Sequence, residues 1–256
     1  MATKKPSAAK SPKKQPDQVE TIEVTVTKTV TKTVKTSAPQ TTNLCFVIDR
    51  SGSMNSIKHE TIGGFNAFID DQRTVPGKVK ATFVQFDHVR EELFRDIDLS
   101  EVPALGPHNY QPRGFTALYD AIGYTLSEGM ERAKPNEENI LIVLTDGAEN
   151  SSKEYKQEDV KRLMNRAEDL GWKVVFLGAN IDVAQVSSGI GMRSAKAVSP
   201  DWTKDQVKAF MMSADGPITM NYTADSAGVT AAYSTASEVV RSIRTKSSIA
   251  PEDPKP

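Results

Sequence analysis

From residue 43 onward, short apolar runs alternate with segments in which apolar residues recur every three or four positions. Buried parallel strands with covering helices produce this alternation. The apolar runs predict strands at 44–48, 79–86, 140–144 and 174–177, with weaker strands at 91–97 and 195–198. The pattern therefore predicts an α/β protein: a Rossmann-like, doubly wound, mostly parallel sheet with helices on both faces.

Helices are predicted between these strands from the 3.6-residue spacing of apolar positions. The segments with this spacing are 57–69, 118–133, 160–170, 204–212 and 227–243. Gly171 is predicted to end the third helix, and the Asp182 side chain is predicted to cap the short segment after the strand at 174–177.

The first 40 residues differ in composition from the rest of the chain. They carry eight lysines and three acidic residues, so this part is near +5 while the remainder is near −6. Residues 1–20 are rich in Lys, Pro, Ala and Ser, a composition that does not offset the entropy of ordering. Residues 21–34 contain β-branched residues in a partial period of two and an imperfect TKTV repeat, which fits either an edge strand or a low-complexity extension. We expect a largely disordered basic tail at 1–40, one domain at 41–246 and a disordered C-terminal tail at 247–256.

The chain has one cysteine, Cys45, inside an apolar run, so we expect a buried thiol and a reducing compartment. The N-terminal lysines are not followed by an apolar signal segment, and no apolar run approaches the roughly 20 residues that cross a bilayer. We therefore expect a cytoplasmic protein without a membrane partner.

The first 40 residues lack arginine and aromatic residues, which argues against nucleic-acid binding beyond weak attraction by the lysines.

Oxygen-bearing side chains follow two of the predicted strands. Asp49, Ser51 and Ser53 come directly after the strand at 44–48, and Asp146 follows the strand at 140–144. Thr116 precedes a predicted helix. Carboxylates and hydroxyls are ligands of hard cations, which favours Mg²⁺, with Mn²⁺ and Ca²⁺ as alternatives. Two carboxylates only neutralise a divalent ion, so such a cation can accept a further anionic ligand. The alternative is an ordinary turn in which these side chains bond their own backbone.

In this order, Asp49-x-Ser51-x-Ser53, Thr116 and Asp146 resemble the metal-ion-dependent adhesion site of the von Willebrand factor A family, over about residues 41 to 245. The resemblance implies hydroxyl ligands at Ser51, Ser53 and Thr116, and carboxylates at Asp49 and Asp146 that act directly or through water. It also implies an antiparallel edge strand, a role that 91–97 can fill. Residues 178–182 and the Ala/Ser-rich last helix resemble a bacterial or phage-borne subgroup. Relatives often work beside AAA+ ATPases, which is the only basis for naming such a partner.

Residues that flank the motif receive simpler interpretations. Phe115 stands where many relatives have a second glycine. Arg50 is expected to point to solvent, with attraction of acidic partners as the alternative. Glu149 and Asn150 are interpreted as surface loop, and Asp120 as either a supporting acceptor or an exposed helix residue. His59, His88 and His108 lack a triad or zinc spacing, so surface or packing roles are expected.

We predict a protein-binding module that is not an enzyme and that grips an Asp or Glu of a partner protein through the bound cation. One alternative is a metal-dependent hydrolase acting on phosphoesters or peptides. Ser51 lacks the G-x-S-x-G context of a nucleophile and no Gly-rich phosphate loop is present, which argues against it. A second alternative is a structural or assembly component whose metal serves folding alone.

Overall fold

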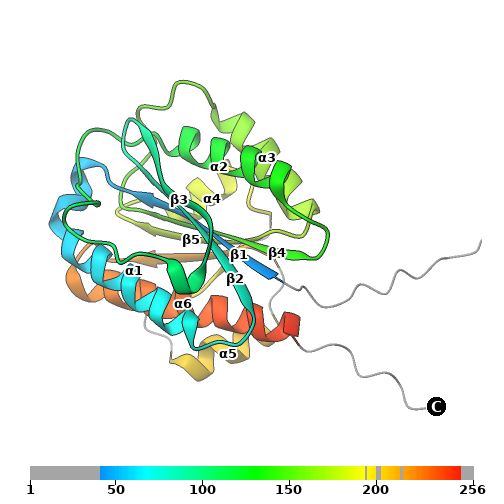
Figure 1. Ribbon diagram of the computed structural model, residues 1–256. Coiled ribbons are helices and arrows are strands. Elements are labelled where there is room, and N and C mark those ends of the chain that lie inside the picture. Colours follow the sequence, from blue (N-terminus) through cyan, green and yellow to red (C-terminus); the bar gives the residue numbers. More distant parts are fainter. Residues whose placement is uncertain (1–40, 194, 200–202, 214–215, 249–256) are drawn as a thin grey trace, which may run out of the picture. The chain divides into compact units, whose positions relative to one another are not determined.

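The computed structural model describes residues 41–193, 195–199, 203–213 and 216–248. These residues contain a seven-stranded sheet of order β3-β2-β1-β4-β5-β7-β6 (Figure 1). The strands are β1 (Thr41–Asp49), β2 (Lys78–Phe86), β3 (Arg90–Asp98), β4 (Glu137–Thr145), β5 (Lys173–Ala179), β6 (Lys196–Ala197) and β7 (Ile218–Tyr222). All neighbouring pairs are parallel except β2 and β3. The predicted fold class is confirmed, and the segment at 91–97 is the antiparallel edge strand.

Six α-helices and two short 3-10 helices connect the strands within the described residues. They are η1 (Gly52–Ile57), α1 (Lys58–Arg73), η2 (Leu99–Glu101), α2 (Leu118–Arg132), α3 (Gln157–Asp169), α4 (Val183–Gly189), α5 (Lys204–Ser213) and α6 (Ser226–Ser248). One face of the sheet is covered by α1, α5 and α6, and the other by α2, α3 and α4 (Figure 1). None of the described helices combines the length and the apolar character that crossing a bilayer requires.

The interior strand β1 is buried on both faces. Phe46 points toward α1, where its ring lies 5.2 Å from Phe65 and 5.4 Å from Phe68, both edge-on. Cys45 and Val47 point to the opposite face, toward the core under α2 and α3. Cys45 is buried as expected, and this burial raises the pKa of its thiol to about 12. The thiol is therefore protonated at neutral pH.

The predicted helix stop and the predicted helix cap are both confirmed, but one strand was not predicted. Gly171 follows α3 with a φ of 84°, and the Asp182 carboxylate accepts a hydrogen bond from the backbone N–H of Gln185 over 2.9 Å. Strand β7 was not predicted, because its five residues include Thr and Asn and form no continuous apolar run. It nevertheless lies inside the sheet, between β5 and β6. The Thr/Val segment at 21–34 and the expected N-terminal tail lie outside the described residues. The expected disordered C-terminal tail began at residue 247, but Ser247 and Ser248 are the last two residues of α6; residues 249–256 lie outside the described residues.

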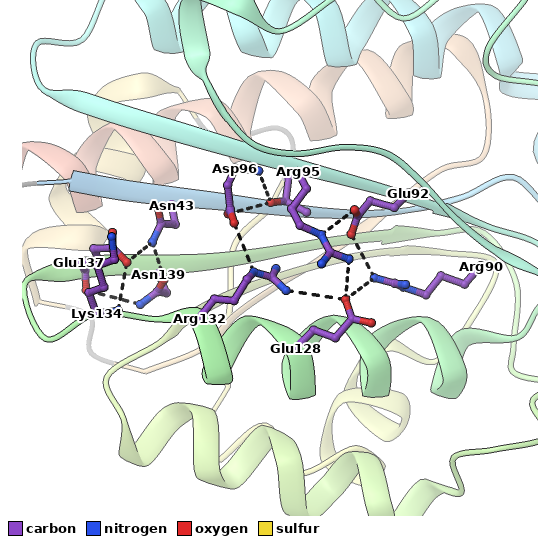
Figure 2. Close-up of polar contacts among 11 residues, drawn as sticks. Asn43, Arg90, Glu92, Arg95, Asp96, Glu128, Arg132, Lys134, Glu137 and Asn139 are labelled. Carbon is purple, nitrogen blue, oxygen red and sulfur yellow. Dashed lines mark hydrogen bonds and ion pairs between the residues drawn. The ribbon is translucent and has the colours of Figure 1, made fainter.

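Edge strand β3 is joined to α2 by charged side chains. Figure 2 shows that Glu128 of α2 contacts Arg90 and Arg95 of β3, at 3.2 and 2.9 Å, and Arg132 of its own helix, at 3.7 Å. Arg132 in turn lies 3.3 Å from Asp96 of β3. Charges on an edge strand also discourage pairing with another chain. This network therefore fixes the edge of the sheet and keeps it polar.

The sheet has a topological switch point between β1 and β4. Strand β1 pairs with β2 on one side and with β4 on the other, and Ile48 lies opposite Leu144. Ligands of open α/β sheets bind outside the carboxyl ends of the strands at such a point. Asp49 ends β1 and Thr145 ends β4 there, so the predicted site stands where this fold places ligands.

Candidate metal centre

Asp49 links the ends of β1 and β4. Its side chain is fully buried. One carboxylate oxygen, Oδ1, accepts the backbone N–H of Ser51 over 2.6 Å, and the other, Oδ2, accepts the Thr145 hydroxyl over 2.6 Å. Both oxygens are therefore held in place by hydrogen bonds.

The two serines connect this carboxylate to the loop after β4. The Ser51 and Ser53 hydroxyl oxygens lie 3.0 Å apart, and Ser53 donates to Oδ1 of Asp146 over 2.6 Å. Ser51 and Asp146 are buried, whereas Ser53 is exposed. The cluster is therefore open to solvent on the Ser53 side.

Thr116 brings a third stretch of chain into the same cluster. Its side chain is buried, and its backbone pairs with Asn150: Thr116 N–H donates to Asn150 Oδ1 over 2.8 Å, and Asn150 N–H donates to the Thr116 carbonyl over 3.0 Å. A Cβ added to Gly147 would lie 3.2 Å from Thr116 Oγ1 and 3.8 Å from Ser53 Oγ. The bare glycine thus keeps a small space free between these two hydroxyls. All five predicted residues lie in one cluster.

Backbone hydrogen bonds fix the Thr116 loop against its neighbours. Gly52 N–H donates to the Gly114 carbonyl over 3.1 Å, and Arg113 N–H donates to the Arg50 carbonyl over 2.8 Å. On the other side, Ala117 N–H donates to the Asp87 carbonyl over 2.8 Å. The position of Thr116 therefore does not depend on its own side chain.

The loop after Asp146 caps the first turn of α2. Glu149 Oε2 accepts the backbone N–H of Tyr119 over 2.8 Å, and Ser152 Oγ accepts that of Asp120 over 3.0 Å. Such contacts satisfy backbone donors that a helix start leaves free. Interpreting Glu149 and Asn150 as simple surface loop missed their contacts with α2 and with Thr116. Asp120 contacts none of the five site residues; its carboxylate accepts backbone N–H groups of residues 153–155.

The prediction for Arg50 is wrong. Its side chain is buried and lies between Asp87, with Nε 3.0 Å from Oδ2, and Glu91. Asp87 is fully buried and is also paired with Arg113 over 2.8 Å. A buried arginine requires such partners. They come from β3 and from the turn between β2 and β3, so the sequence around Arg50 gives no sign of them.

Two buried tyrosines donate hydrogen bonds to backbone carbonyls at the strand ends. Tyr110 donates its hydroxyl to the carbonyl of Asp49 over 2.5 Å, and Tyr222 donates to that of Thr145 over 3.2 Å. Both carbonyls lie at the ends of their strands. Neither tyrosine was predicted as part of the site, because Tyr110 stands in an irregular polar loop and Tyr222 on the strand that was missed.

The two carboxylates are unfavourable neighbours when both are charged. Burial raises the pKa of Asp49 to about 6; hydrogen bonds from Thr145 and Ser51 oppose this rise, and the charge of Asp146 adds to it. Burial also raises the pKa of Asp146, against the hydrogen bond from Ser53. A cation beside them would favour their charged forms. The donors are all oxygens and the Gly147 gap is small, so the residues present fit a hard divalent cation. Among the described residues, no group of three or more His, Cys, Asp or Glu could hold a metal ion.

Comparison with known proteins identifies the class. The model of the von Willebrand factor type A domain family matches residues 43–210. The chain therefore belongs to this family, in agreement with the resemblance of the motif. A comparison with curated protein sequences found no match.

Several solved structures share the fold. The PilB minor pilin from Streptococcus sanguinis is 12% identical, with a TM-score of 0.56 over 80% of this chain and 62% of the pilin. Proximal thread matrix protein 1 from the mussel byssus, described with a zinc-occupied MIDAS motif, is 14% identical, with a TM-score of 0.52 over 80% of this chain and 47% of that one. The SpRpn10 VWA domain is 10% identical, with a TM-score of 0.50 over 74% and 92%. This chain spans less than two thirds of the pilin and the byssus protein, and the likeness is one of fold.

Proposed function

We propose that this chain binds a divalent cation, with Mg²⁺ as the preferred ion, through the hydroxyls of Ser51, Ser53 and Thr116. In this proposal Asp49 and Asp146 balance the charge, directly or through water, and the cation then binds an Asp or Glu of a partner protein. The observation that carries the proposal is the convergence of three distant segments on the space beside Gly147.

Charge explains why a partner's carboxylate would bind there. Asp49 and Asp146 together neutralise a divalent ion, and the three hydroxyls add no further negative charge. The bound cation therefore keeps its affinity for an anion. Ser53 is exposed, so the side from which an anion would approach is accessible.

The small number of oxygen ligands favours magnesium over calcium. Mg²⁺ keeps several waters and takes few ligands from the protein, whereas Ca²⁺ prefers larger sets of oxygens. The byssus relative is described with zinc in its motif. Manganese and calcium are the alternatives for this chain, to be compared with magnesium in the melting experiment described below.

A binding role, not a catalytic one, is supported by what surrounds the five side chains. Their hydrogen-bond partners among the described residues are hydroxyls, carboxylates, backbone groups and the Asn150 amide. No histidine, lysine or cysteine stands among these partners as a general base. That the partner belongs to the AAA+ ATPases rests on the family resemblance alone.

The test is the effect of magnesium on thermal stability and on partner capture. Wild type, Asp146→Ala and the control Asp70→Ala are melted with Mg²⁺ and with EDTA; Asp70 is an exposed carboxylate of α1. Wild type and Asp70→Ala should melt higher in Mg²⁺, and Asp146→Ala should not. Immobilised wild type should retain its partner from native cell extract only in Mg²⁺. Equal retention in EDTA contradicts the proposal.

A hydrolase is distinguished by turnover. Generic phosphodiester and peptide substrates should remain intact with the full chain in Mg²⁺ or Mn²⁺. Hydrolysis that disappears in Ser51→Ala would overturn the non-enzymatic part of the proposal. Magnesium-dependent stability without any magnesium-dependent partner would favour a structural metal.

A further inference from the structure

Two large apolar side chains are exposed beside the candidate metal centre. Phe115 is 67% exposed and immediately precedes Thr116; Val89, in the turn between β2 and β3, is 50% exposed. The described residues contain two other exposed large apolar side chains, Leu170 and Met212. Single exposed apolar residues are ordinary, but apolar side chains that gather at a binding site mark an interaction surface.

The loops that carry Phe115 and Val89 form one continuous surface. The Ala117 N–H donates to the Asp87 carbonyl over 2.8 Å. A Cβ at Gly114 would lie 2.3 Å from Nδ1 of His88, so this ring lies directly against the Gly114 backbone. Gly114 also has a φ of 68°, which favours glycine. The turn at 87–89 is therefore packed against the Thr116 loop.

This surface exposes a positive charge at Arg113. Asp87 is fully buried, whereas its partner Arg113 is 59% exposed. The carboxylate thus faces inward and the guanidinium outward. An acidic segment is complementary to Arg113 as well as to the proposed cation.

From these contacts we infer that Phe115 and Val89 form an apolar surface next to the cation. The partner that binds this surface offers an acidic residue flanked by an apolar one. The inference rests on the proposed function and specifies its ligand. The partner's acid binds the cation beside Thr116, and the side chain next to that acid packs on Phe115. Neighbouring Cα atoms are about 3.8 Å apart, so a residue adjacent to the partner's acid is within reach of Phe115, which is adjacent to Thr116.

Phe115 then determines the specificity for the residue that flanks the partner's acid. Aromatic anchors carry a large share of binding energy at interfaces, whereas many surrounding contacts carry little. Arg113 contributes mainly to orientation and to the rate of association, because an exposed charge is screened by water and salt.

A peptide array tests the inference. Seven-residue peptides with a central Asp carry Leu, Phe, Ser, Asn or Lys on either side of it. They are probed with the labelled full chain in Mg²⁺ and in EDTA. The variants are Phe115→Ala and the control Leu170→Ala, which removes an apolar side chain of similar exposure just after α3. Thermal melting verifies that both variants fold.

Wild type and Leu170→Ala should bind the Leu- and Phe-flanked peptides at least about fivefold more tightly than the Ser-flanked ones, and only in Mg²⁺. Phe115→Ala should lose this preference while it retains the requirement for Asp and Mg²⁺. A wild type that prefers polar neighbours, or a Phe115→Ala variant with an unchanged preference, overturns the inference alone. If no peptide binds in a magnesium-dependent way, the proposed function itself fails.

Discussion

Ser53 donates a hydrogen bond to Oδ1 of Asp146 over 2.6 Å, although the two residues are 93 positions apart in the chain. This contact joins the loop after β1 to the loop after β4. Because Ser53 is exposed and Asp146 is buried, the bond lies at the mouth of the cluster. A cation bound at this place has to compete with it for the same oxygens.

Gly147 should be required for metal affinity but not for the fold. In Gly147→Ala, the new Cβ would lie 3.2 Å from Thr116 Oγ1 and would fill the space between the two hydroxyls. We expect magnesium affinity to fall by about tenfold or more, which corresponds to about 1.4 kcal/mol. The metal-free melting temperature should change little. Titration calorimetry with Mg²⁺ measures the affinity, and an unchanged affinity would show that this space is not the binding site.

Metal-free stability should depend on the ionisation of Asp49. The pKa in the folded protein is about 6, above the value of about 3.9 in an unfolded chain. The folded state therefore binds this proton more tightly, and the contribution of Asp49 to the free energy of unfolding falls as pH rises from about 4 to about 6. The loss from this group is roughly 2 to 3 kcal/mol.

Urea unfolding in EDTA at pH 4 to 7 measures this dependence, with Asp49→Asn as the comparison because the amide does not titrate. The variant should lose less stability than wild type over the same interval. Saturating Mg²⁺ should restore wild type at pH 7 and leave the variant unchanged. Parallel pH profiles of the two proteins in EDTA would refute this role of Asp49.

Tyr110 should stabilise the end of β1 through its hydroxyl. Tyr110→Phe removes the donor to the buried Asp49 carbonyl and should cost about 1 to 2 kcal/mol. Tyr233→Phe is the matched control: Tyr233 is also buried, but its hydroxyl has no hydrogen-bond partner among the described residues. Its removal should be neutral or slightly stabilising. Denaturant midpoints compare the two variants, and equal losses would argue against a specific role for Tyr110.

Among the carboxylates outside the metal centre, Asp87 should be the one whose replacement lowers the stability of the fold most. Asp87→Asn leaves the buried Arg50 without its fully buried anionic partner, which should cost about 3 kcal/mol. Glu91→Gln removes the other, half-exposed partner of Arg50 and should cost less than about 1 kcal/mol. Chemical unfolding of both variants measures the difference. If Glu91→Gln proved the more damaging, the assignment of Asp87 as the main partner of Arg50 would be wrong.

The sequence was informative where the physical signal is local. Apolar runs such as 44–48 predict buried strands whatever packs on them, and the carboxyl ends of parallel strands share one edge of the sheet. Asp49 and Asp146 were therefore placed together correctly. Gly171 and Asp182 acted as predicted because helix stops and caps involve residues close in sequence.

Features that depend on distant residues were not predictable in this way. The burial of Arg50 depends on Asp87 and Glu91, about 40 positions away. Tyr110 reaches Asp49 across 61 positions from an irregular loop. Strand β7 is short and polar in part, and the sheet around it determines its conformation. In each case tertiary contacts determine the structure, and the sequence pattern around the residue does not indicate them.

The most direct measurement is X-ray diffraction from crystals of the full chain grown with Mn²⁺, using the anomalous signal to locate the ion. Our account predicts one strong peak within bonding distance of the Ser51, Ser53 and Thr116 hydroxyl oxygens, with a coordination position open to solvent. The peak should be absent in crystals of Thr116→Val. A peak away from these three oxygens, or an undiminished peak in the variant, would contradict the account.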